Sequence, residues 1–293
     1  MAQPSTDFFM KLPFILAKRF VAGEQFETSV PASKALNKAN HQLTLDLLGE
    51  NVATKAEADA SVAAYINVLN GIKEHDLLSG ISIKLTMLGL DIDIEYCADN
   101  LFHLLEHAEK QGQFVRIDME GSAYTSITLE LFKKAHERFG SKHVGTVIQA
   151  MLHRTKEDIA ECASMGADIR LVKGAYKESP KRALQKMSDI RDAYNAYAET
   201  LIQHTAFPRF GTHDDELIRS IREYLAEHNL PCNRVEFQML YGLREQGLQD
   251  LNRLGYPTRV YVPFGTDWFP YFSRRLAERK ENIWFVISTL FKR

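Results

Sequence analysis

A short apolar run followed by a longer amphipathic stretch recurs along this chain of 293 residues, and this repeat restricts the fold more than any other feature. Each run has the length of a strand that is buried on both faces, because such strands read as nearly continuous apolar segments. We expect strands at residues 43–48, 81–85, 114–118, 144–149, 169–173, 209–213, 234–238 and 259–263.

The stretches between these runs carry signals that helices begin there. Thr54 and Glu57 have the spacing of a capping box, in which a hydroxyl and a carboxylate each satisfy a backbone N–H. Thr155 precedes two acids that favour the start of a helix, and Ser179 is followed by a proline suited to a first helical position. The runs and these signals together predict an α/β protein.

Eight strands that alternate with helices are the count of a closed (βα)8 barrel of the TIM type. A doubly wound open sheet stays an alternative, because the alternation alone does not prove closure. We expect one domain over residues 1–293, with N-terminal helices in 1–42, the barrel in 43–280 and a C-terminal helix in 281–293. The last barrel helix would lie around residues 267–279.

Charge and cysteine usage exclude several classes of function. The net charge is −2, with 36 Lys and Arg against 38 Asp and Glu and no basic tract, so we expect no nucleic-acid partner.

Cys97, Cys162 and Cys232 are far apart, which argues against a zinc site, any other metal centre and a disulfide framework. No apolar stretch reaches the roughly 18 residues of a membrane span. The N-terminus also lacks a secretory signal, so we expect a cytoplasmic protein.

Polar side chains gather at the carboxyl ends of the expected strands, where barrel enzymes carry their chemistry. So many polar groups on one face would be costly to bury without a polar ligand. They are Lys84, Asp118, Glu120, Gln149, Lys173, Tyr176, Thr212, His213, Asp214, Glu236, Gln238 and Tyr261. On the last helix, Arg274 and Arg275 form a pair that can flank one anion, and Glu278 is spaced for a helical ion pair with Arg274.

Several mechanisms are excluded because their motifs are missing. The chain has no GxGxxG, no GxxxxGK[ST] and no GxSxG, and its only comparable histidine pair does not have the HExxH arrangement. Three chemistries stay open at this point: proton abstraction, Schiff-base formation at Lys84 or Lys173, and redox chemistry on a cofactor held by the strand ends.

Seven motifs in order resemble the proline dehydrogenase family. They are LDLLGE at 45–50, VRIDME at 115–120, IQA at 148–150, RLVKGAY at 170–176, GTH at 211–213, EFQ at 236–238, and YVP at 261–263 with Arg274 and Arg275. The resemblance implies a distorted (βα)8 barrel whose last helix lies over the mouth. It also implies FAD-dependent oxidation of L-proline to Δ1-pyrroline-5-carboxylate, by hydride transfer to flavin N5, with a quinone as electron acceptor. The length is similar to that of the monofunctional bacterial enzymes. Met151 departs from the family, which often has an aromatic residue there.

The resemblance also implies residue roles. Lys84, Arg274 and Arg275 match the cations that bind the substrate carboxylate, and Leu240 and Tyr261 match residues that pack on the proline ring. Asp118 matches a catalytic-site acid, which we expect to organise Lys84. Arg170 matches the arginine near flavin N5, and Glu50 matches a gate that pairs with Arg274, to which we add Glu278. The matched FAD contacts are Met119, Gln149, Arg170, Lys173, Gly174, Ala175, Thr212, His213 and Gln238.

Other interpretations stay open. A hydroxyproline dehydrogenase is one, although Tyr261 would crowd a ring hydroxyl. A Schiff-base lyase or aldolase using Lys173 is a second, and a catalytically silent barrel that binds amino acids is a third. Asp118 is alternatively a structural partner of Lys84, and His213 a neutral core histidine. The apolar tail at 283–293 either docks on the barrel or makes peripheral contact with a membrane, where a quinone would be met.

Overall fold

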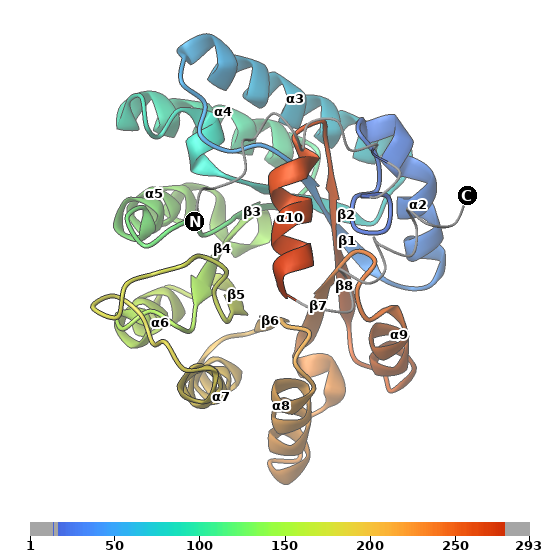
Figure 1. Ribbon diagram of the computed structural model, residues 1–293, viewed down its shortest axis with the longest axis vertical. Helices are drawn as coiled ribbons and strands as arrows, with labels where there is room; N and C mark the ends of the chain where they lie inside the picture. The colour runs from blue at the N-terminus through green and yellow to red at the C-terminus, as the bar shows by residue number, and fades with distance from the viewer. Residues whose placement is uncertain (1–13, 15–16, 279–293) are drawn as a thin grey trace, which may run out of the picture.

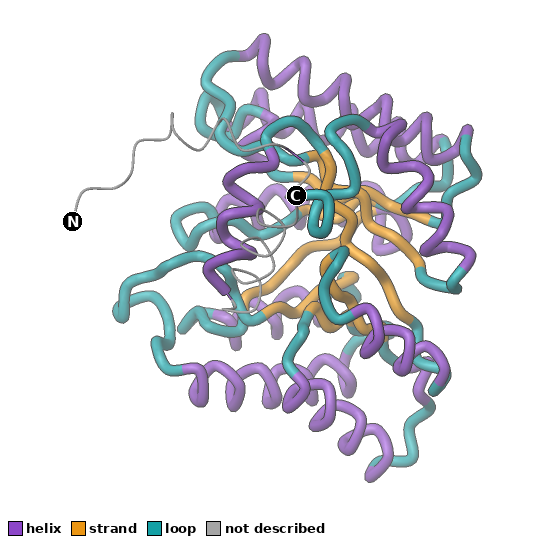
Figure 2. Tube along the Cα trace, turned by 45° about the vertical axis from the view of Figure 1, so that its right-hand side comes forward, coloured by secondary structure: helices purple, strands orange, loops and turns teal. Residues whose placement is uncertain are grey.

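Eight parallel strands close into a barrel in the computed structural model, which describes residue 14 and residues 17–278 (Figure 1). Each strand pairs with the next along the chain, and β1 (Gln42–Leu47) pairs with β8 (Thr258–Phe264) to close the ring. The (βα)8 barrel expected from the sequence is therefore confirmed, and the open sheet is excluded. Figure 2 shows the helices arranged around the central strands.

The remaining elements follow the alternation that the sequence predicts. They are α2 (Phe26–Lys38), α3 (Lys55–Glu74), β2 (Ser79–Ile83), η2 (Leu85–Leu88), α4 (Ile94–Lys110), β3 (Val115–Ile117), α5 (Thr125–His143), β4 (Val144–Gln149), α6 (Thr155–Ser164), β5 (Asp168–Val172), α7 (Met187–His204), β6 (Arg209–Gly211), α8 (Asp215–Glu227), η3 (Cys232–Arg234), β7 (Glu236–Leu240), α9 (Glu245–Arg253) and α10 (Trp268–Glu278).

Three local expectations are wrong or incomplete. The residues from Ser179 onward form a loop, and α7 begins only at Met187. Thr155 is the first residue of α6 rather than its cap, and its hydroxyl donates to the Gln149 carbonyl at 2.5 Å. The seventh strand begins at Glu236, because residues 232–234 form a 3₁₀ turn. The capping box at Thr54 is confirmed. The expected C-terminal helix and most of the N-terminal segment lie outside the described residues.

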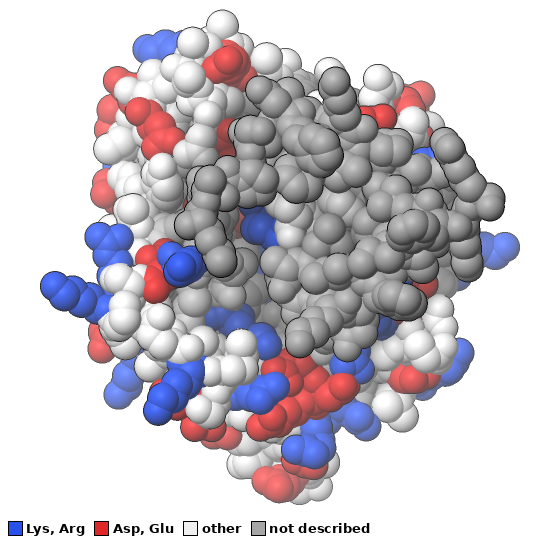
Figure 3. Space-filling view, in the orientation of Figure 1, with Lys and Arg blue, Asp and Glu red and all other residues white. Residues whose placement is uncertain are grey.

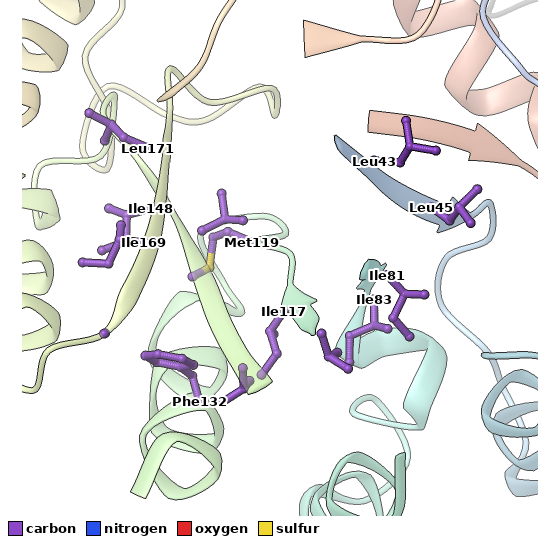
Figure 4. Close-up of a cluster of buried hydrophobic side chains, with 14 of the residues drawn as sticks. Leu43, Leu45, Ile81, Ile83, Ile117, Met119, Phe132, Ile148, Ile169 and Leu171 are labelled. Carbon is purple, nitrogen blue, oxygen red and sulfur yellow. The ribbon is translucent and has the colours of Figure 1, made fainter. Parts of the chain in front are cut away.

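The two faces of the barrel wall differ in polarity, which corrects the expectation of nearly continuous apolar strands. Outward residues such as Leu43, Ile81, Ile117 and Leu171 belong to one apolar core shared with helix residues such as Phe132 (Figure 4). Because side chains alternate along a strand, the residues between them face the barrel interior. Many of these interior residues are charged or polar.

The amino-terminal part of the barrel interior holds a chain of alternating charges. Its members are Arg116, Asp168, Arg209, Glu236 and Arg259, from five different strands. Arg209 Nη2 lies 2.7 Å from Asp168 Oδ2, and Arg209 Nη1 lies 2.8 Å from Glu236 Oε1. Arg259 Nε lies 2.9 Å from Glu236 Oε1, and Arg116 pairs with Asp168 at the other end. Each acid therefore lies between two guanidinium groups, which offsets the cost of burial.

Helix α10 lies across the mouth of the barrel, as the resemblance implied (Figure 1). Its apolar side packs against the described N-terminal residues in a small cluster separate from the main core. The cluster consists of Ala17, Phe20, Val21, Leu48, Trp268, Tyr271 and Phe272. The N-terminal residues are also joined to β8, because the Ala22 N–H donates a hydrogen bond to the Pro263 carbonyl at 2.9 Å. No helix among the described residues is long and apolar enough to cross a membrane.

The charge chain predicts a strong dependence of stability on Glu236. Substitution Glu236→Gln leaves Arg209 and Arg259 buried without their shared carboxylate, so we expect the free energy of unfolding to fall by about 3–5 kcal/mol. Chemical denaturation measures this loss. The control is Asp250→Asn, which removes an exposed pair with Arg253 and should change stability by less than about 1 kcal/mol. Equal effects of the two substitutions would contradict the prediction.

The same chain predicts how stability varies with pH. Burial alone would raise the pKa of Glu236 and of Asp168, but the flanking guanidinium groups hold both pKa values below their usual range. The stabilisation is therefore fully present above the ordinary carboxyl pKa and is lost as the pH falls through the lowered values. We expect acid titration of the Glu236→Gln variant to show a shallower loss of stability than that of the unmodified protein.

Candidate active site

A cavity of about 1050 Å³ opens at the carboxyl end of the strands and is roofed in part by α10. This volume is at the upper limit of ordinary small-molecule sites. Most residues that the sequence singled out line it. These are Glu50, Lys84, Asp118, Met119, Arg170, Lys173, Gly174, Ala175, Tyr176, Thr212, His213, Asp214, Gln238, Leu240, Tyr261, Arg274 and Arg275.

Three residues that the sequence singled out, and whose side chains the structure describes, do not line the cavity: Glu120, Gln149 and Glu236. Gln149 is buried at the end of β4, and its Nε2 donates to the Glu120 carbonyl at 3.0 Å. The Glu120 carboxylate in turn accepts from the Thr86 hydroxyl at 2.6 Å, so this chain of contacts links the loops after β3 and β2. Glu278 is the last residue of α10, and its side chain is outside what the structure describes.

Asp118 is the centre of a hydrogen-bond group in the cavity. Its Oδ1 accepts from the Ser82 hydroxyl at 2.7 Å and from Arg170 Nη1 at 3.0 Å, and its Oδ2 accepts from the Tyr261 hydroxyl at 2.7 Å. The Arg170 guanidinium also lies over the Tyr261 ring, 5.4 Å from its centroid. Residues from β2, β5 and β8 and the loop after β3 are thus held in one fixed arrangement.

Lys84 has a different partner from the one expected. Its Nζ lies 3.2 Å from Asp46 Oδ1, and both side chains are almost fully buried. The expected direct pairing of Lys84 with Asp118 is therefore corrected, because the carboxylate of Asp118 faces Ser82, Arg170 and Tyr261 instead. Burial alone would lower the pKa of Lys84, but the charge of Asp46 holds it above its usual range, so the amine is protonated.

Helix α10 brings its two arginines into different environments at the cavity. Arg274 Nη2 lies 3.1 Å from Glu50 Oε1, and both side chains are about one-third exposed. Arg275 is 7% exposed, and its guanidinium lies 5.1 Å from the centroid of the Tyr271 ring. Arg274 with Glu50 therefore lies at the entrance, whereas Arg275 reaches the interior.

The other end of the cavity has a glycine at its wall and ionic groups at its rim. Gly174 has a φ of +117°, and a Cβ there would lie 2.5 Å from the Met151 sulfur, so this position requires glycine. Lys173 Nζ lies 3.0 Å and Arg191 Nε 2.9 Å from Asp214 Oδ2. Burial would raise the pKa of Asp214, but these two cations lower it to about 2. Figure 3 shows acidic side chains gathered near the start of α8, with basic ones beside them.

His213 connects the ends of β6 and β7. Its Nε2 accepts a hydrogen bond from the Leu240 backbone N–H at 2.9 Å, so its proton is on Nδ1 if the ring is neutral. Arg244 Nη1 donates to the His213 carbonyl at 3.0 Å. His213 thus combines a structural contact with a place on the cavity wall.

Sequence reasoning did not assign a role to several residues that line the cavity: Asp46, Tyr176, Arg191 and Tyr271. Asp46 could have been found from the sequence, because an acid inside an apolar strand needs a buried partner and therefore indicates a polar site. Tyr271 lies one helical turn before Arg274 and Arg275, and this spacing could have indicated that it shares their face of the helix. Arg191 comes from the second turn of α7, and nothing in its local sequence marks it. Among the described residues, no group of three or more His, Cys, Asp or Glu is arranged to hold a metal ion.

Comparison with known proteins gives consistent matches. The family model described as proline dehydrogenase matches residues 30–287. Proline dehydrogenase 2 of Bacillus subtilis (strain 168) is 38% identical over 279 residues, covering 95% of this chain and 91% of the relative. Proline dehydrogenase of Deinococcus radiodurans is 34% identical over 280 residues, covering 94% of this chain and 90% of the relative.

A solved structure agrees with the sequence matches. The structure of proline utilization A (PutA) from Bdellovibrio bacteriovorus, inactivated by N-propargylglycine, superposes with a TM-score of 0.83 at 26% identity. The match covers 90% of this chain but only 32% of that longer protein. The family model, the relatives and the barrel with its mouth-covering helix lead to one conclusion: the chain belongs to the proline dehydrogenase family.

Proposed function

We propose that this protein oxidises L-proline to Δ1-pyrroline-5-carboxylate with bound FAD, as the first step of proline catabolism, and passes the electrons to a quinone. The observation that carries the proposal is that one cavity contains both a cationic pocket suited to a carboxylate and a glycine-walled cleft suited to a large cofactor.

The residues of the cavity fit a flavin nucleotide. The volume suits a large ligand, and Gly174 allows close approach to the backbone after β5. Arg170 Nε is buried without a hydrogen-bond partner among the described residues, although the rest of the side chain is fixed by Asp118. Lys173, Gly174, Ala175, Thr212 and His213 would hold the cofactor, with Met119, Gln238 and Arg170 around its reactive ring. Gln149 does not line the cavity, and it would support the site indirectly, through its hydrogen bond to the Glu120 carbonyl.

When bound, FAD supplies a two-electron oxidant that takes up the hydride lost from the ring carbon next to nitrogen, while the amine loses a proton. The chain supplies binding and orientation. Lys84 and Arg275 would bind the substrate carboxylate from the cavity interior, and Arg274 from its entrance. A carboxylate held at fixed points orients the proline ring for the reaction.

Tyr261 and Leu240 would pack against the proline ring, and the hydrogen bond from Tyr261 to Asp118 fixes the tyrosine ring in place. Arg170, held by the same carboxylate, would present its positive charge to a bound flavin, where a cation favours reduction. A tyrosine fixed in this position leaves little room for a ring hydroxyl, which favours proline over hydroxyproline. Glu50 and Arg274 form a pair that can open to admit the substrate and close behind it.

A Schiff-base mechanism has less support. A nucleophilic lysine must be neutral, but Lys173 pairs with Asp214 and Lys84 pairs with Asp46. The charge of Asp46 favours the protonated form of Lys84, and the amine of Lys173 is engaged in its ion pair with Asp214. The geometry therefore favours amine oxidation over a lyase or aldolase reaction.

The proposal predicts the colour of the protein. Purified protein, reconstituted with FAD if necessary, should be yellow and should bleach when L-proline is added without oxygen, because the substrate reduces the flavin. Absorption spectroscopy in the visible range measures this. A protein that cannot bind FAD would contradict the cofactor assignment, and a lysine adduct trapped by borohydride would support the Schiff-base alternative.

The proposal also predicts the effect of removing Arg275. Substitution Arg275→Met should raise the KM for proline at least about tenfold with FAD still bound, because the loss of one partner of a buried charge pair costs about 2–5 kcal/mol. Steady-state kinetics and the flavin spectrum measure the two effects. The control is Arg219→Met, which changes an exposed arginine of α8 that pairs with Glu223, and which should leave KM unchanged. An unchanged KM in the Arg275 variant would show that this arginine does not bind the carboxylate.

A further inference from the structure

Asp46 is a buried acid whose partner in the cavity is Lys84. The register of β1 places it beside Ser82 of β2 and Pro263 of β8. Its side chain is 2% exposed and that of Lys84 is 9% exposed, and their closest atoms are 3.2 Å apart. Burying a charged group is costly without a partner, so each of these two side chains depends on the other.

Other ionisable groups surround Lys84 at longer range. Asp118 faces it from the loop after β3, Tyr65 from α3 and Glu50 from the loop after β1, and Glu120 also acts on it. Within the described part of the chain, however, the only ion pair that Lys84 forms is the one with Asp46. The carboxylate of Asp118 is committed to Ser82, Arg170 and Tyr261.

An ammonium group has three N–H donors, so Lys84 can bind Asp46 with one and still offer others to a ligand. Burial is the largest influence on the pKa of Lys84 and acts to lower it, and the charge of Asp46 is the largest opposing influence. Removing that charge therefore leaves a buried amine that loses its proton more readily.

We propose that Asp46 is a positioning residue that keeps Lys84 protonated and directed into the cavity, where its ammonium group meets the carboxylate of the substrate. This inference rests on the proposed function for the identity of the ligand, but the coupling between Asp46 and Lys84 can be measured without turnover. It adds to the site a cavity-lining residue whose proposed action on the substrate goes through Lys84.

The first experiment measures the protonation of Lys84 directly in the flavin-loaded protein. Trace labelling with acetic anhydride between about pH 6 and pH 10 modifies only neutral amines, and mass spectrometry of peptides gives the extent of labelling at Lys84. In the Asp46→Asn variant, Lys84 should be labelled about tenfold more than in the unmodified protein at a given pH in this range, because a pKa lower by about one unit leaves more of the amine neutral. An unchanged labelling profile would overturn the inference.

The second experiment measures binding of tetrahydrofuran-2-carboxylate, which has the ring and carboxylate of proline but no amine to oxidise. Its dissociation constant, followed by the perturbed flavin spectrum, should vary little with pH in the unmodified protein. In Asp46→Asn it should rise about tenfold or more as the pH increases, because the neutral amine no longer attracts the carboxylate. Adding Lys84→Met should abolish this additional pH dependence, and Asp46→Glu should restore much of the affinity.

The matched control is Asp158→Asn, which removes a buried acid 2.8 Å from Arg154 Nε, outside the cavity. It should leave both the labelling of Lys84 and the binding constant unchanged. If the extra pH dependence of Asp46→Asn persists without Lys84, the inference is wrong. If proline fails to reduce the flavin while the labelling shift of Lys84 is found, the proposed function fails and the coupling between the two residues stands.

Discussion

Charged side chains inside a protein are stable only when each has a partner, and this barrel places many of them on the inner face of its wall. Near the amino-terminal end of the strands, each buried acid of the charge chain lies between two arginines. Higher in the barrel, Asp46 faces Lys84 and Asp118 faces Arg170. The apolar contacts that hold the strands together lie on the outer face, against the helices.

This separation explains how the site combines rigidity with reactivity. The lower charges are paired with one another and fix the strand positions. The upper pairs, Asp46 with Lys84 and Asp118 with Arg170, line an open cavity, and Lys84 keeps N–H donors that a ligand can use. Helix α10 then adds cations from above, and one of them, Arg274, has its own acid at the entrance.

The sequence predicted the fold class and most of the cavity wall because both depend on local patterns. Apolar runs mark strands, and the carboxyl ends of parallel strands meet at one mouth. The residue pattern alone therefore places Lys84, Asp118 and Tyr261 together, whereas Arg170 was assigned to the site only through the family resemblance. Which residues pair could not be predicted in the same way. The partner of Lys84 depends on the register between β1 and β2, and the contact of Arg191 with Asp214 depends on how α7 packs. Gln149 shows the reverse case: it ends a strand as expected, yet its side chain turns away to bond the Glu120 carbonyl.

The contact between α10 and the segment around residues 17–21 has a consequence for the order in which the molecule is completed. The two partners are separated by nearly the whole length of the chain, as are β1 and β8, which close the ring. Contacts between such distant segments form only after a large loss of chain entropy. During synthesis, the earlier strands and helices leave the ribosome well before the residues that complete the mouth. A ligand that needs the finished mouth can therefore be captured only by a chain that already includes β8 and α10, so shorter nascent chains cannot sequester it.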